Sequence, residues 1–177
     1  MLNQKIFYFF NSFAGRNNIL DSLFVFLAND LPWAIIAFVF IYFVFIRKSP
    51  RRFFIVSLIV GTSALFTEFL KWIVFKHPRP FAALPDVVQL IQINPLGSFP
   101  SQHATIFASL ATAVFLYDRK VGGWLLVLTF IIGLCRIVAG IHYPFDILTG
   151  FVLGFAITFL AYRLYNKLLK SLKDYFS

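Results

Sequence analysis

Three polar segments of this chain carry the residue types from which catalytic sites are made. They read KHPRPF at residues 76–81, SFPSQHA at 98–104 and CRIVAGIHYPFD at 135–146. Each lies at or near the end of an apolar stretch, where ionisable groups are costly and usually mark a site. The alternative is separate interfacial anchors whose charged ends reach water. Three such segments favour a shared site, with these candidates: His77, His103, His142, Arg79, Arg136 and Asp146.

The arginines and the helix start near Ser101 suit a phosphate group. Arg79 and Arg136 each offer a planar fork of donors that matches a tetrahedral oxyanion. Ser101 precedes an apolar helical run and is expected to cap it, so that the free backbone N–H groups of residues 101–104 point at an anion. Lys76 is either a further cation or a solvated loop lysine. The pattern predicts a phosphate pocket that needs no metal ion.

Two histidines and an aspartate supply the groups that phosphoryl transfer requires. His142 and Asp146 are four residues apart, and Pro144 between them suits the first turn of the last helix. At this spacing the carboxylate can accept from one imidazole nitrogen and leave the other as a nucleophile. His103 remains as the general acid for the leaving oxygen. With the two arginines, these residues predict phosphoryl-transfer chemistry.

The composition shows what surrounds these residues. Of the 177 residues, 60% are hydrophobic and 13% are charged, and the mean hydropathy is +0.82. A soluble domain is about half apolar and a quarter charged, so an integral membrane protein is expected. The net charge of +9 does not indicate a nucleic-acid partner, because the basic residues are not gathered on a polar domain. Cys135 is the only cysteine, which excludes an intramolecular disulfide.

Five apolar runs are expected to cross the bilayer as helices. The charge-free runs are 15 or 16 residues long, whereas a span takes roughly 20 residues, so each helix must extend into its polar flanks. The expected spans lie near residues 30–47, 53–75, 101–118, 121–139 and 144–163. The predicted fold is all-α, an integral membrane helical bundle that forms a single domain over residues 1–177.

Basic residues alternate between the two sides of this bundle. Ten Lys and Arg residues fall in segments 47–52, 118–120 and 162–177, and three fall in loop 76–100 and the turn at 136–143. By the positive-inside rule the first set is cytoplasmic. The three polar segments are therefore expected on the outer side of the membrane.

The N-terminal segment is expected to lie in the membrane interface. Residues 19–28 either form a second interfacial piece or extend the first span. Residues 2–14 predict an amphipathic helix, because they place four apolar side chains at helical spacing, namely Ile6, Phe9, Phe10 and Phe13.

Two further features concern packing. Loop 82–96 is largely apolar and either lies against the bilayer or covers the pocket. Gly150 and Gly154 form a small-xxx-small pattern in the last span, which favours close helix packing, although glycine is also common in membrane helices.

The three polar segments resemble the signature of the type 2 phosphatidic acid phosphatases, a superfamily that includes the vanadium haloperoxidases. The usual form is K-x6-R-P, then P-S-G-H, then S-R-x5-H-x3-D. This chain has PRP at 78–80, PSQH at 100–103 and CRIVAGIHYPFD at 135–146. The spacing of the third motif fits without gaps.

The resemblance implies a role for each matching residue. His142 would attack phosphorus and form a phosphohistidine, Asp146 would orient it, and His103 would protonate the leaving group. It implies no metal or other cofactor. The implied phosphate ligands are Arg79, Ser101, Arg136 and the backbone N–H groups of Gln102 and His103.

The sequence departs from the signature at three positions. Trp72 stands where the lysine of the first motif is expected, and Lys71 is one residue too early, so Lys71 is left out of the site and is expected to pair with Glu68 on the helix. Gln102 replaces a glycine, which keeps the backbone donors. Cys135 replaces a serine, which removes a hydroxyl contact.

In these departures and in its short length, the chain resembles the bacterial undecaprenyl-diphosphate phosphatases of this superfamily. The resemblance implies a multi-pass protein of the cell (inner or plasma) membrane that hydrolyses undecaprenyl diphosphate in the bilayer, with its site on the outer, periplasmic side. Alternative substrates are phosphatidylglycerol phosphate, phosphatidic acid and the 1-phosphate of lipid A, and a lipid phosphotransferase is a further alternative. A small transporter or structural membrane protein stays a hypothesis of a different class.

Overall fold

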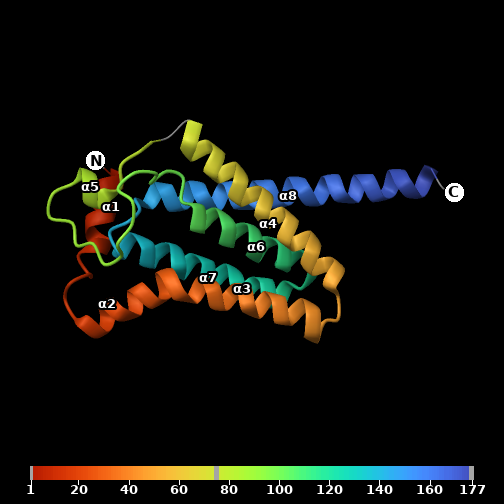
Figure 1. Cartoon of the computed structure of the whole chain (residues 1–177), viewed down its shortest axis with the longest axis horizontal. Coiled ribbons are helices and arrows are strands. Elements are labelled where there is room, and N and C mark those ends of the chain that lie inside the picture. The colour runs from red at the N-terminus through yellow and green to blue at the C-terminus, as the bar shows by residue number, and fades with distance from the viewer. Residues whose placement is uncertain (1, 74–75, 176–177) are drawn as a thin grey trace.

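The computed structural model describes residues 2–73 and 76–175, and within these ranges it contains helices and no β-strand (Figure 1). This confirms the all-α prediction. The first long helical stretch, Asn18–Ile46, contains two short π-helical turns, of which η1 lies within it and η2 forms its C-terminal end. In chain order the elements are α1 (Leu2–Asn11), α2 (Asn18–Val25), η1 (Phe26–Asp30), α3 (Leu31–Ile41), η2 (Tyr42–Ile46), α4 (Pro50–Ile73), α5 (Pro80–Ala83), α6 (Gln102–Tyr117), α7 (Arg119–Val138) and α8 (Pro144–Tyr175).

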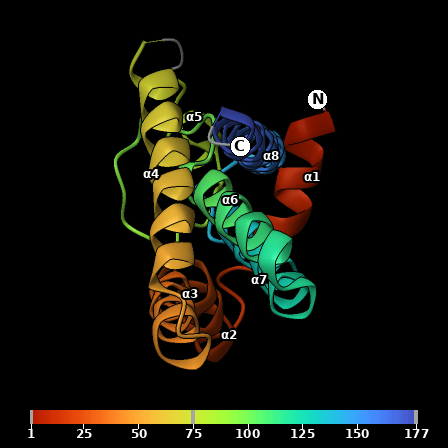
Figure 2. The ribbon, with the colours of Figure 1, turned by 90° about the vertical axis from the view of Figure 1, so that its right-hand side faces the viewer.

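Four stretches of the described chain are long and apolar enough to cross a membrane, namely Asn18–Ile46, Pro50–Ile73, Arg119–Val138 and Pro144–Leu168. The fifth expected span, near residues 101–118, forms α6. Its 16 residues correspond to about 24 Å, less than the roughly 30 Å of a bilayer core. Helix α6 packs on α4, α7 and α8 as the central helix of the bundle, and although it is shorter than the other spans it runs from the end with the polar segments toward the end with residues 118–120 (Figure 1 and Figure 2).

The first span begins at Asn18, earlier than the expected start near residue 30, because residues 19–28 extend it. The side chain of Asn17 caps this helix by accepting hydrogen bonds from the backbone N–H groups of Ile19 and Leu20. Of the two interpretations of residues 19–28, the structure therefore favours continuation of the span.

Helix α1 docks on the bundle through a face other than the apolar stripe that is expected to meet the membrane interface. Phe7 and Asn11 are buried, whereas Phe9 and Phe13 are 62% and 41% exposed. The Phe7 ring lies 5.6 Å from the Tyr143 ring. The exposed phenylalanines are the part of the predicted apolar face that remains free to meet the membrane interface.

Loop 82–96 covers the end of the bundle that carries the polar segments. The Asn11 side chain donates to the backbone oxygens of Val88 and Val138 and accepts from the backbone N–H of Val88. The backbone N–H of Leu90 donates to the carbonyl of Ala139. These bonds join the loop to α1 and α7, which favours the covering interpretation.

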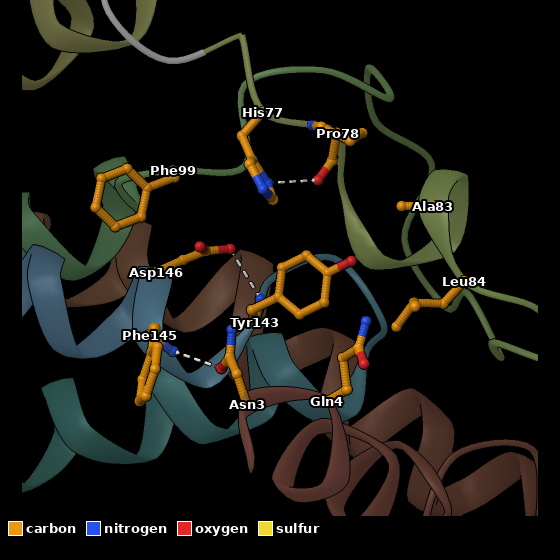
Figure 3. A pocket seen from close by; sticks show the side chains of 10 residues that line it. All are labelled: Asn3, Gln4, His77, Pro78, Ala83, Leu84, Phe99, Tyr143, Phe145 and Asp146. Atoms are coloured by element: carbon orange, nitrogen blue, oxygen red, sulfur yellow. Dashed lines mark hydrogen bonds between the residues drawn. The ribbon is translucent and has the colours of Figure 1, made fainter. Parts of the chain in front are cut away.

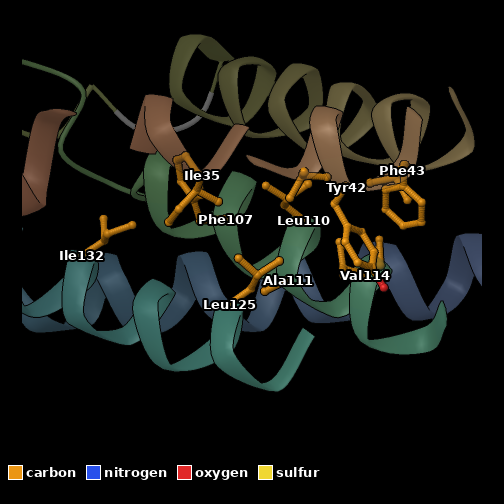
Figure 4. Packing of buried hydrophobic residues seen from close by; sticks show 12 residues of the cluster. Ile35, Tyr42, Phe43, Phe107, Leu110, Ala111, Val114, Leu125 and Ile132 are labelled. Atoms are coloured by element: carbon orange, nitrogen blue, oxygen red, sulfur yellow. The ribbon is translucent and has the colours of Figure 1, made fainter. Parts of the chain in front are cut away.

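The apolar core lies where α6 meets the first span, α4 and α7 (Figure 4). Side chains from all of these helices interlock there, including Ile35, Phe43, Phe107, Val114 and Leu125. This packing fixes α6, whose first turn contributes to the polar end of the bundle.

Helices α6 and α8 approach each other closely at the two glycines of α8. A Cβ atom at Gly154 would lie 2.5 Å from the backbone oxygen of Thr105, and one at Gly150 would lie 2.7 Å from the backbone oxygen of Ser101. The structure therefore supports the packing interpretation of the small-xxx-small pattern.

We expect Gly154→Ala to lower the stability of the protein in detergent by about 1–3 kcal/mol, because the added methyl group overpacks the α6–α8 contact. Gly123→Ala in α7 is the matched control, since nothing lies within 4 Å of a Cβ there. Thermal unfolding of the two variants measures the difference. Equal stability would contradict the close packing of α6 on α8.

Candidate active site

The three polar segments converge at one end of the bundle, as the sequence predicted. Arg79 precedes α5, Ser101 precedes α6, and His142 lies in the turn between α7 and α8. Arg79 contacts His142, and the backbone N–H of Ser101 donates to the carbonyl of Asp146 at 3.1 Å. His103 and Arg136 lie within electrostatic range of His142. The structure therefore brings together residues that are up to 67 positions apart, from Arg79 to Asp146.

His142 lies between an arginine and an aspartate. Its Nε2 atom is 3.1 Å from Nη1 of Arg79, and its Nδ1 atom is 3.4 Å from Oδ2 of Asp146, within ion-pair range but short of a well-aligned hydrogen bond. Arginine can only donate, so Nε2 must accept and carries the lone pair. The ring proton then belongs on Nδ1, which faces the carboxylate. This tautomer leaves a lone pair on Nε2, the form of imidazole that can attack an electrophile such as phosphorus.

The surroundings of His142 keep its imidazole neutral. The side chain is buried, and this burial, together with the charges of Arg136 and Arg79, holds the pKa of His142 well below its usual value. Burial also lowers the pKa of the Arg79 guanidinium, which stays charged because the ordinary pKa of arginine is above 12.

We expect His142 to remain neutral with its proton on Nδ1 at about pH 6, where an unperturbed histidine is largely protonated. The measurement is ¹⁵N NMR of the histidine-labelled protein in detergent, which is tractable because the chain has three histidines. The signal of His142 is assigned from its loss in His142→Gln. A protonation midpoint near 6.5 would contradict the buried, arginine-facing environment.

Ser98 holds the Asp146 carboxylate, a contact that the sequence did not predict. Its hydroxyl donates to Oδ2 of Asp146 at 2.5 Å, and the backbone N–H of Tyr143 donates to the same oxygen at 2.8 Å. Both Ser98 and Asp146 are buried. These bonds fix the carboxylate against His142. The available signal was the position of Ser98 within the second polar segment.

The N-terminus of α6 has the predicted cap. The Ser101 hydroxyl accepts from the backbone N–H of Ala104 at 3.5 Å, and the helix begins at Gln102. The Thr105 hydroxyl donates to the Ser101 carbonyl at 3.0 Å. Gln102 and His103 thus occupy the first turn, where backbone N–H groups have no helical acceptor.

Arg136 is buried and only partly hydrogen-bonded. Its Nη1 donates to the backbone oxygen of Ala28 in η1 at 3.0 Å, while its Nε has no hydrogen-bond partner in the described chain. A buried donor without a partner is costly. An anion bound beside Arg136 would satisfy it. The adjacent Cys135 is buried as well.

Lys71 lies beside the site although the motif spacing had excluded it. It lines a cavity of about 450 Å³, together with Glu68, its expected helical neighbour. Lys71 is also within electrostatic range of Arg136 and Asp146. The other residues that line this cavity, which we call the outer cavity, are Trp72, Lys76, Arg79, Asn94, Leu96, Gly97 and Gln102.

A second cavity, of about 640 Å³, is lined in part by Asp146 (Figure 3). Its walls include His77 and Tyr143, with Asn3 and Gln4 from α1. The Nδ1 atom of His77 is 3.1 Å from the carbonyl oxygen of Pro78. His77, the third candidate histidine, thus lines the cavity that Asp146 borders and does not contact His142 within the part of the chain that the structure describes.

Comparison with known proteins decides the family. The sequence pattern of the PAP2 superfamily matches residues 52–170. The chain belongs to the PAP2 superfamily. This PAP2 chain is 32% identical to undecaprenyl-diphosphatase BcrC of Bacillus subtilis over 98% of its own length and 89% of that protein. It is 31% identical to a Bacillus licheniformis protein named bacitracin transport permease protein BcrC, over 86% of its length and 75% of that one.

The fold of this PAP2 chain matches a solved structure of Aquifex aeolicus LpxE with a TM-score of 0.78 and 25% identity, over 92% of this chain and 96% of that one. The match accords with the helical bundle described above. The protein is therefore a PAP2 membrane phosphatase, similar to undecaprenyl-diphosphatases.

Proposed function

We propose that this PAP2 phosphatase hydrolyses undecaprenyl diphosphate to undecaprenyl phosphate and phosphate through a phosphohistidine on His142. The observation that carries the mechanism is the pair of contacts that His142 makes. Its Nε2 atom contacts Nη1 of Arg79, and its Nδ1 atom contacts Oδ2 of Asp146. Similarity to a protein named undecaprenyl-diphosphatase along nearly the whole chain supports the substrate.

In the first step, Nε2 of His142 attacks the terminal phosphorus and the bond from phosphorus to the bridging oxygen breaks. The incoming phosphate takes the place of Nε2 as the acceptor of the Arg79 Nη1 donor. Arg136 offers its unpartnered Nε, and His103 gives a proton to the bridging oxygen as it leaves with the lipid. Asp146 stabilises the positive charge that develops on the His142 ring.

In the second step, a water molecule attacks the phosphohistidine. His103, now deprotonated, accepts the proton of the water, and the bond from phosphorus to Nε2 breaks. Inorganic phosphate leaves and His142 returns to its neutral form. The whole chain, residues 1–177, acts as one catalytic unit in this proposal, with Ser101 and the backbone of Gln102 among the phosphate ligands.

The distribution of charge supports an outward-facing site in the cell membrane. The basic segments at residues 47–52 and 118–120 lie at the end of the bundle opposite to the polar segments, and α8 runs on in the same direction toward its basic C-terminal part (Figure 1). Because basic segments favour the cytoplasm, the site would face the outer, periplasmic side.

The test of the proposed function is phosphate release from a lipid panel in detergent at equal mole fraction. The panel contains undecaprenyl diphosphate, phosphatidylglycerol phosphate, phosphatidic acid and lipid A 1-phosphate. We expect the diphosphate to have the highest kcat/KM. A higher value for a monoester would replace the proposed substrate, labelled phosphate on an acceptor lipid would indicate a phosphotransferase, and no release from any lipid would leave the transporter hypothesis.

We expect activity to persist in excess chelator, because arginine side chains and helix N–H groups carry the phosphate charge in this mechanism. The measurement is the rate of phosphate release before and after dialysis against chelator. Loss of activity that a divalent ion restores would contradict the prediction.

A further inference from the structure

The outer cavity lies next to the position of the reacting phosphate and is lined by cations. The role assigned to it below rests on the proposed function. Arg79 connects it to the nucleophile. Nη1 of Arg79 contacts His142, and Nη2 donates to the carbonyl of Gly97 at 3.4 Å. Arg79 and Gly97 both line the cavity. A phosphate held by Arg79 next to His142 would therefore have the outer cavity as its immediate neighbour.

The charge of the outer cavity suits a second anionic group. Its walls carry the cations Lys71, Lys76 and Arg79 and one carboxylate, Glu68. Lys71 and Arg79 also act on His142 electrostatically, whereas Lys76 is not among the charges that do so. Lys76 is exposed and makes no hydrogen bond or ion pair within residues 2–73 and 76–175.

We propose that the outer cavity binds the leaving phosphate of a lipid diphosphate and that Lys76 is its cation. When the bond from the terminal phosphorus to the bridging oxygen breaks, its electron pair passes to the leaving phosphate. Lys76 stabilises that charge, while Arg79 and Arg136 hold the phosphate that is transferred. A monoester, whose leaving group is an alcohol, places no charge in this cavity. Lys76 is thus a specificity-determining residue.

The test compares Lys76→Gln with wild type on undecaprenyl diphosphate and on phosphatidic acid. We expect kcat/KM for the diphosphate to fall about five- to tenfold, as for one charged contact at a partly exposed site, and kcat/KM for the monoester to stay unchanged. Lys48→Gln, an exposed lysine on the connection before α4, is the matched control and should change neither.

Inhibition gives a second measurement that does not use the diphosphate as substrate. With phosphatidic acid as substrate, Lys76→Gln should raise the Ki of methylene diphosphonate and leave that of inorganic phosphate unchanged. Equal losses on both substrates, or no loss on either, would overturn the Lys76 subsite. A wild-type enzyme that prefers monoesters would overturn the proposed function instead, so the two failures are distinguishable.

An independent observation concerns how Arg136 is held. Ala28 lies in the π-helical turn η1 and Pro32 lies in the first turn of α3, and because proline has no N–H it donates no hydrogen bond to the carbonyls of the preceding turn. Ala28 is fully buried, so its carbonyl needs a partner. Nη1 of Arg136 donates to it at 3.0 Å.

The structure assigns Pro32 the role of a positioning residue for Arg136. Proline keeps a competing N–H away from the Ala28 carbonyl, and the carbonyl then anchors one end of the guanidinium. The other end, at Nε, stays unpartnered and is available to the phosphate in the proposed function. The first span thereby sets the position of a phosphate ligand on α7.

The test is Pro32→Ala, which supplies the missing N–H. We expect a severalfold increase in the Ki of orthovanadate, a phosphate mimic, with no loss of thermal stability, because alanine suits a helix better than proline does. Trp33→Ala is the control, since Trp33 is 71% exposed and the change leaves the backbone donors as they are.

Two further variants separate positioning from a structural effect. Replacing Pro32 by an α-hydroxy acid, which has an ester oxygen instead of N–H, should restore the wild-type Ki. In an Arg136→Lys background, Pro32→Ala should add nothing to the Ki, because the anchored group is already gone. An unchanged Ki in Pro32→Ala, additive effects in the double variant, or no rescue by the ester would each overturn the role of Pro32.

Discussion

His142→Gln is expected to lower kcat/KM for the lipid diphosphate by at least about 10³-fold, since it removes the nucleophile of the proposed reaction. His142 is fixed by Arg79 on one side and Asp146 on the other, and glutamine cannot offer a nucleophilic nitrogen in that position. Phosphate release by purified protein in detergent measures the loss, and thermal unfolding checks that the variant is folded.

The matched control is His77→Gln. His77 is an exposed histidine at the same end of the bundle, and its ring nitrogen faces the carbonyl of its neighbour Pro78. We expect its kcat/KM to stay within about twofold of wild type, as for a surface substitution. An active His142→Gln variant would mean that another group attacks phosphorus.

His103→Gln is expected to separate monoesters from diphosphates. An alkoxide is a far poorer leaving group than a phosphate, whose second pKa is near 6, so a monoester depends on the general acid much more. We expect kcat/KM for phosphatidic acid to fall about 10²- to 10³-fold and kcat/KM for undecaprenyl diphosphate to fall less than about tenfold. The ratio of these two losses is the measured quantity.

The ratio is informative because kcat/KM reports only the steps up to release of the first product. A role of His103 in the later hydrolysis of the phosphohistidine lowers kcat and leaves kcat/KM unaffected. Equal losses on both lipids would show that His103 does not act as the acid for the leaving oxygen.

The parts of the site that were predictable are those set by local spacing. His142 and Asp146 are four positions apart, and this spacing with Pro144 between them places His142 just before α8 and Asp146 in its first turn. The cap at Ser101 follows from its position before an apolar run. The convergence of the three segments followed from alternation of the spans, since all three lie on one side of the predicted bundle.

The contacts that the sequence did not reveal join residues far apart in the chain. Ser98 and Asp146 are 48 positions apart, and Ala28 and Arg136 are 108 positions apart. No local pattern encodes such pairs, because they depend on how the helices pack. Lys71 illustrates the same limit, since the motif spacing excluded it and the packing of α4 beside Arg79 brings it to the outer cavity.

The face of α1 that docks on the bundle was not predicted, for a related reason. Helical spacing identified an apolar stripe containing Phe9 and Phe13, but a bilayer and a protein surface both bury apolar side chains. The face of α1 that packs on the bundle contains Phe7 and the polar Asn11. The side-chain amide of Asn11 forms hydrogen bonds with the backbone of Val88 in the covering loop and with the carbonyl of Val138. Hydrophobicity alone does not distinguish the two environments in a chain that is 60% hydrophobic.

The most direct test of a phosphohistidine on His142 is rapid-quench trapping of the intermediate with undecaprenyl diphosphate labelled in its terminal phosphate. The His103→Gln variant is the best enzyme form, because it retains the first step on a diphosphate and slows hydrolysis of the phosphohistidine. The phosphohistidine mechanism predicts an acid-labile, alkali-stable label on Nε2 of His142 that chases to inorganic phosphate. A label on another residue, or release of phosphate with no labelled protein at any quench time, would contradict it.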